Sequence, residues 1–464
     1  MSVTLDFNNM MAETVGVHGI TQKQFEDYSN MAKCAHGAVE ANRGKGMQEW
    51  MCSPYNQSKV VKAINKTAKK IQRNFENFVV LGIGGSALGP IAVFTALKHL
   101  HYNELPKKVR KTPRFYVVDN VDPERMNALF DIIDVKKTAF NVITKSGSTS
   151  ETMSQYLIVM DMLTEKLGED ASKHIFATTS QTKGNLIKLA EKYGFETFYI
   201  PEGVGGRFSE LSPVGLLPAA VVGIDIEKML LGAKDMDEKC KADGIYENPA
   251  LAMAVLQYIS MKQGKNVGVM MPYADSLKYI ADWYCQLWAE SLGKEVDKSG
   301  KMVNAGQTPV KALGVTDQHS QVQLYNEGPF DKVITFLEVE KFRSTVQIPY
   351  GCEEFPNVNF LCGHTLNELI SKELFATRYN LAKRGRSNYT IILDEVNEYN
   401  IGALLYMFQL QTAYCGELLN IDAYNQPGVE GGKNATYALF GRKGFEQLAR
   451  EIEENKVTGK YIIK

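Results

Sequence analysis

Short apolar runs alternate with longer helical stretches through most of this chain. Turn residues rich in Gly, Asp and Ser follow the runs, and a helical stretch separates one run from the next. Strands joined through helices in this way pair in parallel, and the helices cover both faces of their sheet. The alternation therefore predicts an α/β fold. The first series of predicted strands lies at residues 78–85, 114–120, 139–147, 174–180 and 195–200.

A second series of runs begins after Gly223. Its predicted strands lie at residues 265–273, 331–339 and 388–396. A chain of 464 residues is also too long for one compact core. We therefore predict two lobes, the first at residues 45–235 and the second at residues 236–464, with residues 1–44 packing on the second.

Charge and composition exclude several classes of partner. Lys and Arg number 52 against 53 Asp and Glu, so the net charge of −1 offers no field to hold a nucleic acid or an anionic membrane. We find neither a secretory signal nor the roughly 18 apolar residues that a membrane helix needs. Seven scattered cysteines indicate reduced thiols, and Cys362 and His364 have no second ligand pair at a metal-binding spacing. We expect a cytoplasmic protein without a metal.

A hydroxyl-rich loop follows the predicted strand at 139–147. Six of the nine residues 144–152 are Ser or Thr, and a helical stretch comes next. Backbone N–H groups at a helix start, together with hydroxyl donors, bind a phosphate monoester well. Helix capping is the alternative interpretation, but one residue would suffice for it.

The glycines at Gly82, Gly84 and Gly85 also join a predicted strand to a helix. Their GxGGS spacing differs from the GxGxxG of dinucleotide loops, so a nicotinamide site is not favoured. Glycines at this place can instead let the backbone approach a sugar closely.

Glu290 lies where a helix disfavours a carboxylate. It borders the apolar face of the helical stretch at 276–293 and falls in its final turn. The negative end of the helix dipole costs an exposed carboxylate up to about 1 kcal/mol. Burial and dipole together favour proton uptake, as a general base requires. The alternative is a solvated Glu paired with Lys294 or Lys298.

Three other residues have an unusual local setting. Lys433 is predicted near the positive end of a helix on an apolar stripe, although its stem could pack while its head reaches water. His319 follows a plausible cap at Thr316, where the dipole favours a neutral imidazole. Arg207 lies among the glycines of 203–209, where a guanidinium can face an oxyanion. Purely structural roles remain open for all three.

Taken together, these segments resemble the glucose-6-phosphate isomerase family. GVGGRFSELSPVGL (203–216) and GELLNIDAYNQPGVEGGK (416–433) resemble its two signatures, and LGIGGSALGP, KSGSTSET, ESLGK and TDQHS follow the family's order. The resemblance covers about residues 75–435. Glu210 departs from the small or apolar residue expected after the Arg-aromatic-Ser run, while the charged core of the motif is present.

The resemblance implies a fold and an activity. It implies two α/β lobes of the sugar-isomerase (SIS) type with mainly parallel five-stranded sheets, and a homodimer that works without metal, nucleotide or other cofactor. It also implies reversible isomerisation of D-glucose 6-phosphate to D-fructose 6-phosphate through a cis-enediolate, in glycolysis and gluconeogenesis.

The resemblance further implies roles for individual residues. Glu290 would carry a proton between C2 and C1, and Arg207 would stabilise the enediolate. Lys433 and His319 would assist ring opening, with His319 reaching across from the neighbouring subunit. The residues that would bind substrate are Gly84, Gly85, Ser86, Gln426 and, around the phosphate, Thr144, Lys145, Ser146, Ser148 and Thr149.

Two alternatives to this activity remain open. A non-catalytic sugar-phosphate sensor would need the Ser/Thr loop but not the four catalytic candidates together, so their joint presence favours an enzyme. An isomerase of broader specificity, accepting mannose 6-phosphate, is the other, because discrimination between sugar epimers depends on side-chain placement.

Overall fold

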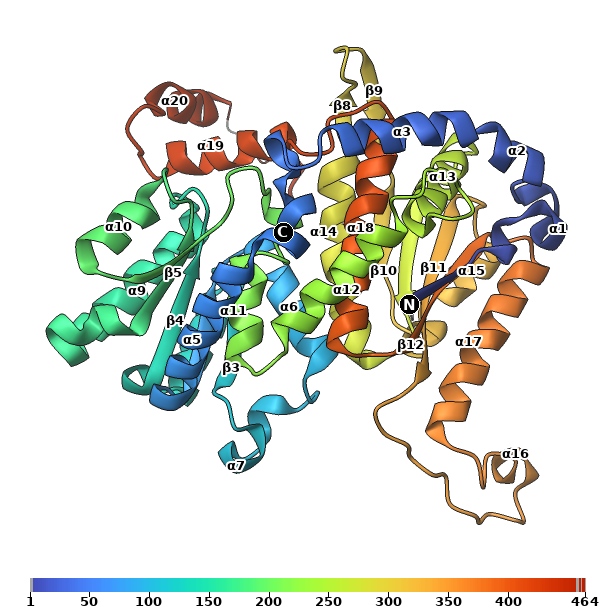
Figure 1. The fold of residues 1–464 in the computed structure, drawn as a ribbon, viewed down its shortest axis with the longest axis horizontal. Coiled ribbons are helices and arrows are strands. Elements are labelled where there is room, and N and C mark those ends of the chain that lie inside the picture. The colour runs from blue at the N-terminus through green and yellow to red at the C-terminus, as the bar shows by residue number, and fades with distance from the viewer. Residues whose placement is uncertain (1–2, 456–458, 460, 464) are drawn as a thin grey trace.

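Two five-stranded sheets form the framework of the chain (Figure 1). The computed structural model describes residues 3–455, 459 and 461–463. Almost all strand pairings in the two sheets are parallel. The predicted α/β fold with mainly parallel sheets is therefore confirmed.

The first sheet is parallel throughout. In spatial order its strands are β3 (Arg114–Val118), β2 (Asn77–Leu81), β4 (Thr138–Ile143), β5 (Ile175–Thr179) and β6 (Glu196–Tyr199). Each of the five predicted runs overlaps one of them. The three central strands are buried along their whole length, which is why they form continuous apolar runs in the sequence.

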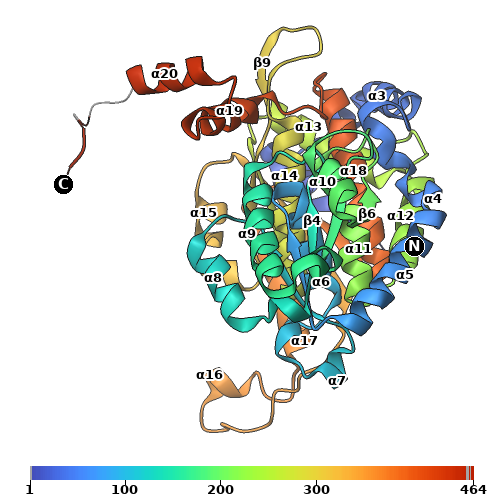
Figure 2. The same cartoon turned by 90° about the vertical axis from the view of Figure 1, so that its left-hand side faces the viewer.

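Helices cover both faces of this sheet (Figure 2). They are α5 (Ser58–Asn74), α6 (Leu88–Leu97), α8 (Pro123–Ile132), α9 (Ser150–Leu167), α10 (Asn185–Tyr193) and α11 (Pro213–Val221). The short helix α7 (Lys107–Arg110) lies beyond the end of the sheet (Figure 1). Alternate residues of β2 enter separate cores: Phe78 and Val80 lie in the cluster that includes Ile64 of α5, whereas Val79 lies in the cluster that includes Val159 of α9.

The second sheet is mixed. In spatial order its strands are β1 (Val3–Asp6), β12 (Asn388–Glu395), β11 (Lys332–Lys341), β7 (Val267–Pro272) and β10 (Thr308–Lys311). Only β1 pairs in the antiparallel sense, with β12. The three predicted runs of the second series overlap β7, β11 and β12. A separate antiparallel pair is formed by β8 (Lys294–Val296) and β9 (Met302–Ala305).

Long helices lie between and around the two sheets. They are α3 (Ser29–Ala41), α12 (Ile226–Lys239), α13 (Pro249–Lys262), α14 (Lys278–Leu292), α17 (Leu366–Lys383) and α18 (Glu398–Leu418). Nearly every residue of α18 is buried, because α3, α12, α13 and α14 all pack on it. The helix α14, which follows β7 of the second sheet, also packs on α6, which covers the first sheet. This contact joins the two sheets' surroundings.

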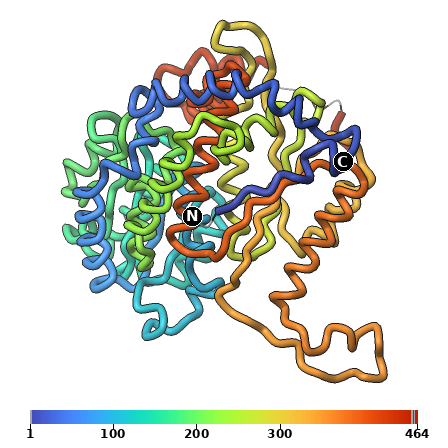
Figure 3. The backbone as a smooth tube through the Cα atoms, turned by 45° about the vertical axis from the view of Figure 1, so that its right-hand side comes forward, coloured from blue at the N-terminus to red at the C-terminus, as the bar shows by residue number. Residues whose placement is uncertain are grey.

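Short helices complete the described chain. They are α1 (Ala12–Val15), α2 (Gln22–Asp27), α4 (Ser53–Asn56), α15 (Val322–Glu327), α16 (Pro356–Asn359), α19 (Glu430–Leu439) and α20 (Glu446–Glu454). Between β11 and α17 the chain extends from the body as an arm that carries α16 (Figure 3). None of the helices in the described ranges combines the length and apolar character needed to span a bilayer.

Candidate active site

A cavity of about 1020 Å³ lies beyond the carboxyl ends of strands in the first sheet. Ligands of open α/β folds collect at this edge. Its walls come from the loop after β4, from the glycines before Arg207, and from the segment 422–437 that follows α18. The predicted site residues that line it are Ser86, Thr144, Lys145, Ser146, Ser148, Thr149, Gln426 and Lys433.

The loop between β4 and α9 turns tightly at Gly147. Its φ of 60° lies in the left-handed region, and a Cβ atom there would come within 2.2 Å of the backbone nitrogen of Leu186. The Thr144 hydroxyl accepts the N–H of Gly147 at 3.2 Å and lies 3.0 Å from the Thr149 hydroxyl. One glycine and two threonines thus shape the loop.

The start of α9 is not capped by a side chain. Thr149 occupies the N-cap position, but its hydroxyl makes no capping hydrogen bond with any residue described. The hydroxyls of Ser146 and Ser148 line the cavity 3.2 Å apart. The capping hydrogen bond that the alternative interpretation requires is therefore missing among the described residues. The free N–H groups at the positive end of the helix and the nearby hydroxyls suit an anion.

Lys145 links this loop to the segment before Arg207. Its ammonium donates to the carbonyls of Glu202 at 2.5 Å and Val204 at 3.1 Å. Burial lowers the pKa of Lys145 from its ordinary value. Its charge stands at the cavity wall, where it can attract an anion, while its hydrogen bonds hold two loops together.

Arg207 is almost fully buried and fixed by several partners. It lies in the short 3-10 helix η8 (Gly206–Phe208) and is 3% exposed. Its Nε donates to the Ser291 hydroxyl at 2.7 Å, and one terminal nitrogen donates to Gln426 Oε1 at 2.9 Å. The other donates to the carbonyls of Ala423 at 2.7 Å and Asn425 at 3.1 Å. The guanidinium therefore has a fixed position.

Glu290 is paired with Arg207. Its Oε2 accepts from the terminal nitrogen that also binds Gln426, at 3.1 Å, and the carboxylate is one-third exposed. Glu290 lies in the final turn of α14, as the sequence predicts. Lys294 donates instead to the backbone carbonyl of Glu290, and Lys298 pairs with Glu417, so neither provides the counter-ion considered from the sequence.

Gln286 is a site residue that the sequence interpretation missed. Its Nε2 donates to Glu290 Oε1 at 3.1 Å, from one turn earlier on α14, while its own buried Oε1 has no hydrogen-bond partner among the described residues. A Cβ atom on Gly84 would lie 3.0 Å from this amide. The spacing of four residues from Glu290 was the available signal, because it places both side chains on one helix face.

Gly84 and Gly85 bring the loop after β2 against the catalytic candidates. Gly84 has a φ of 57°, and both glycines lie in the 3-10 helix η4 (Gly84–Ser86). A Cβ atom on Gly85 would come within 2.2 Å of the carbonyl of Gly206, next to Arg207. Ser86 lines the cavity, whereas the two glycines allow this close packing.

Lys433 lies in the first turn of α19 and lines the cavity. Its ammonium pairs with Glu430 at 2.9 Å and its side chain is half exposed. The helix position is as predicted, but the apolar stripe around it is exposed, with Val429 at 42% and Phe440 at 87%. The Tyr437 hydroxyl donates to the carbonyl of Ser148 at 3.3 Å and so connects α19 to the loop after β4.

His319 is not brought together with the other candidates. It is exposed at the end of the 3-10 helix η10 (Thr316–His319), and among the described residues it is not one that lines the cavity. The prediction of a first helical turn at His319 is wrong, since α15 begins only at Val322. Asp317 instead accepts the backbone N–H of Leu313 and the hydroxyl of Ser320, which stabilises a turn.

The charges at the site influence one another. Burial lowers the pKa of Arg207, and the neighbouring carboxylate of Glu290 acts in the opposite direction. Burial, with a contribution from Arg207, lowers the pKa of Lys294 to about 8. Within the described ranges, no group of three or more His, Cys, Asp and Glu side chains is arranged to hold a metal ion. The site offers an anion cradle, a carboxylate and a fixed guanidinium.

The chain is similar to known proteins along most of its length. The family model "Phosphoglucose isomerase" matches residues 57–443. A glucose-6-phosphate isomerase of Carboxydothermus hydrogenoformans is 50% identical over the full length of both chains. Another, from Rubrobacter xylanophilus, is 42% identical over 96% of this chain and 99% of its own length.

Solved structures show the same fold. A hypothetical protein from Thermus thermophilus is 36% identical, with a TM-score of 0.85 over 94% of this chain and 99% of its own. A glucose-6-phosphate isomerase from Chlamydia trachomatis has a TM-score of 0.83 at 20% identity, over 98% of this chain and 92% of its own, which bears on the fold alone. From the family model and the two curated relatives, the chain belongs to the phosphoglucose isomerase family.

Proposed function

We propose that this protein is a glucose-6-phosphate isomerase, which interconverts D-glucose 6-phosphate and D-fructose 6-phosphate in glycolysis and gluconeogenesis. The observation that carries the proposal is the pair of Arg207 and Glu290, in which Arg207 also binds Gln426 in the wall of a cavity that is lined by a hydroxyl-rich loop at a helix start. The names of the two curated relatives, which match 100% and 96% of the chain, support the same activity.

The loop after β4 is the proposed phosphate site. Ser146, Ser148 and Thr149 would donate to the phosphate oxygens together with the uncapped N–H groups of α9, and Thr144 and Lys145 stand beside them. Phosphate binding at a distance from C1 and C2 orients the sugar, so that binding energy lowers the chemical barrier. Ser86, Gln426 and the backbone at Gly84 and Gly85 would line the sugar.

Glu290 and Arg207 are the proposed reacting groups. The carboxylate of Glu290 would take the proton from C2 and return it to C1, and Arg207 would donate to the oxyanion of the cis-enediolate. A donor fixed in advance at a developing oxyanion contributes on the order of 3 kcal/mol. The hydrogen bonds of Arg207 to Ser291, Ala423 and Asn425 supply that fixed position. The reaction moves hydrogen within one substrate, so we propose no metal and no redox cofactor.

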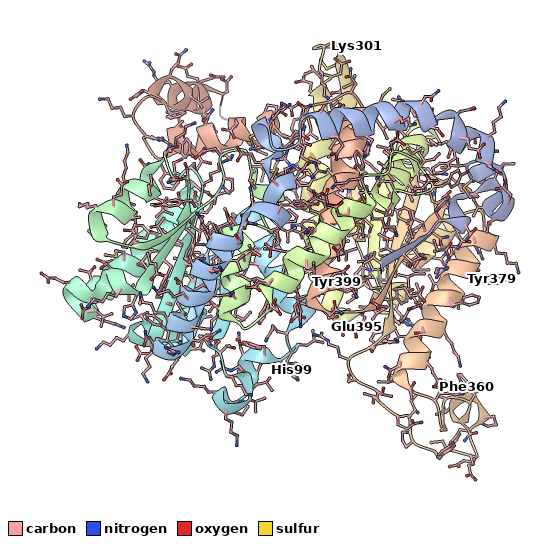
Figure 4. The ribbon with its side chains drawn as sticks, viewed as in Figure 1. His99, Lys301, Phe360, Tyr379, Glu395 and Tyr399 are labelled. Atoms are coloured by element: carbon pink, nitrogen blue, oxygen red, sulfur yellow. The ribbon has the colours of Figure 1, made fainter. Side chains whose placement is uncertain are left out.

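Ring opening would need Lys433 and a histidine from a second subunit. Lys433 lines the cavity, whereas His319 is exposed outside it, which supports a homodimer in which each His319 serves the other subunit's site. The arm before α17 also exposes large apolar side chains that a second copy could cover, among them Tyr350, Phe355 and Phe360. Figure 4 shows Phe360 beside α16 in this arm.

We also propose the lobe division at residues 45–235 and 236–464, with residues 1–44 on the second lobe. The pairing of β1 with β12 and the packing of α3 on α18 support the last point. All seven cysteines are free thiols in the structure, which fits a cytoplasmic location.

The direct test is turnover of fructose 6-phosphate by the purified protein, with formation of glucose 6-phosphate coupled to its dehydrogenase and a chelator present. We expect turnover that the chelator does not change. Tight binding of fructose 6-phosphate without turnover would replace the proposal by a sugar-phosphate sensor. Comparable turnover of mannose 6-phosphate would broaden the specificity.

A further inference from the structure

Glu210 carries a carboxyl group that is buried without a partner. It lies three residues after Arg207 and is 1% exposed. Among the residues that the structure describes, neither Oε1 nor Oε2 has a hydrogen-bond partner. This is also the position at which the segment 203–216 departs from the small or apolar residue expected of the family. The catalytic proposal gives this residue no role.

Two glycines make room for the carboxyl group. A Cβ atom on Gly89 would lie 2.0 Å from Oε2 of Glu210, and a Cβ atom on Gly215 would lie 2.3 Å from Oε1. Gly89 belongs to the first turn of α6, and Gly215 belongs to the first turn of α11. The two oxygens therefore touch the backbones of two helices at their starts.

Among the described residues, the elements packed against Glu210 place no counter-charge beside its carboxyl group. Neither α6 nor α11 has an ionisable side chain, and η8 contributes only Arg207, whose guanidinium binds Glu290 and Gln426 instead. Burial alone raises the pKa of Glu210 well above its usual range. A buried carboxyl group without a partner charge takes up a proton, because its ionised form would be poorly solvated there.

The segment that contains Glu210 makes a second contact, with η4 just before α6, and this contact is closer to the cavity. There, Gly85 packs against the carbonyl of Gly206, as described above. The Ser209 hydroxyl donates to the same carbonyl at 2.7 Å and stiffens the turn between the two contacts. Arg207 thus lies between a contact at Gly85 and a contact at Glu210.

We propose that Glu210 is a positioning residue for Arg207. The neutral carboxyl group of Glu210 acts as a spacer between α6 and the segment 206–215. It touches no substrate and acts through the backbone that carries Arg207. This inference rests on the proposed function, in which Arg207 stabilises the enediolate. A shift of the Arg207 backbone would change the geometry of Glu290, since the two side chains are hydrogen-bonded.

The first test compares variants that keep or remove the spacer. Glu210→Gln keeps its shape and its neutral charge, so we expect kcat within about twofold of the unsubstituted enzyme. Glu210→Ala removes it, and we expect kcat to fall by roughly 10- to 100-fold with little change in KM, because the phosphate loop is untouched. An unchanged kcat in Glu210→Ala, or an equal loss in Glu210→Gln, would overturn the proposal.

A second test enlarges Gly89 and then shortens Glu210. Gly89→Ala places a methyl group against the carboxyl oxygen, so we expect it to lower kcat even though alanine favours the helix. Combining Gly89→Ala with Glu210→Ala removes the collision and should raise kcat above that of Gly89→Ala alone. A double variant no better than Gly89→Ala would contradict the spacer, and thermal unfolding of each variant separates this from loss of folding.

The protonation of Glu210 can be measured without activity. Its pKa is higher in the folded than in the unfolded protein, so the stability it contributes is complete below the unfolded pKa of about 4.3 and is lost as the pH rises towards the folded pKa. Over that window the unfolding equilibrium constant of the unsubstituted protein should rise about tenfold per pH unit relative to Glu210→Gln. Parallel stability curves of the two proteins would show an ionised Glu210 and refute the neutral spacer.

Infrared difference spectra provide an independent readout. We expect the carbonyl band of a protonated carboxyl group at neutral pH in the unsubstituted protein and its absence in Glu210→Gln. A missing band in the unsubstituted protein would refute the neutral spacer. Because the band and the pH-dependent stability do not depend on turnover, failure of the isomerase proposal would be seen separately, in the assay with fructose 6-phosphate.

Discussion

Replacing Glu290 by Gln tests the proposed base with little change in shape. The carboxylate accepts from Gln286 on one oxygen and from Arg207 on the other. An amide has a single acceptor, and its oxygen should turn towards the charged Arg207. Its NH₂ group would then face Gln286, whose own Oε1 has no partner among the described residues and can accept after an amide flip. The variant should therefore keep both contacts.

The expected loss is confined to catalysis. General-base catalysis typically contributes about 10²- to 10⁴-fold, so we expect kcat to fall by roughly this factor, equivalent to about 3–5 kcal/mol. Calorimetric affinity for fructose 6-phosphate should stay within about threefold, because the phosphate loop is unchanged. Loss of deuterium from C2 of labelled glucose 6-phosphate should decline together with kcat, since Glu290 is proposed to remove that proton.

Glu338→Gln is the matched control. Glu338 also pairs with an arginine, Arg378, at 2.9 Å, and its side chain is 26% exposed against 33% for Glu290. Arg378 also binds Asp6, whereas Arg207, the partner of Glu290, also binds Gln426 in the cavity wall. We expect near-normal kcat in this control. If Glu290→Gln kept a kcat within tenfold of the unsubstituted enzyme, or if both variants lost activity equally, the assignment of the base would be refuted.

Three further predictions follow from the site. Ser148→Ala with Thr149→Ala should weaken calorimetric binding of 6-phosphate sugars by at least about tenfold, because hydrogen bonds to a charged group contribute roughly 1.5–3 kcal/mol each; unchanged binding would move the phosphate elsewhere. If His319 acts across the interface, mixing the variants His319→Ala and Glu290→Gln with subunit exchange should restore roughly a quarter of full activity, because half the dimers would hold one intact site of two. No recovery of activity would place His319 in the site of its own subunit. Because the pKa of Lys294 is lowered in the folded protein, the unfolded state binds more protons between about pH 8 and about pH 10.4. The free energy of unfolding relative to Lys294→Met should therefore rise with pH in that window. A difference in unfolding free energy that does not change with pH would contradict the lowered pKa.

The sequence predicts the buried strands better than the edges of the sheets. A strand such as β2 lies between helices on both faces, so every residue after Asn77 is apolar and the run is easily recognised. β10 was not predicted because it is a four-residue edge strand that includes Pro309 and exposes residues at both ends. β1 is similarly short, and its pairing with β12 joins residues nearly 400 positions apart, which no local pattern encodes.

The candidate site was predictable where charge conflicts with local structure. Glu290 and Lys433 stood out because each lies at the helix end that disfavours its charge. Gln286 carries no charge, so only its spacing of four residues from Glu290 could have indicated the contact, and that spacing alone does not single out one amide on a buried helix. For His319, the described chain contains no cavity partner, which is what a residue acting in a second subunit would show.

The glycines of the two loops explain how the reacting groups can meet. Arg207 follows the first sheet, and Glu290 lies on a helix that precedes much of the second, so their hydrogen bond depends on the packing of α6 against α14. A side chain at Gly84 would press on Gln286, and one at Gly85 would collide with the backbone beside Arg207. These glycines are therefore required by the approach of two parts of the protein. A separate space lies between the starts of α6 and α11, where Gly89 and Gly215 leave room for the carboxyl group of Glu210.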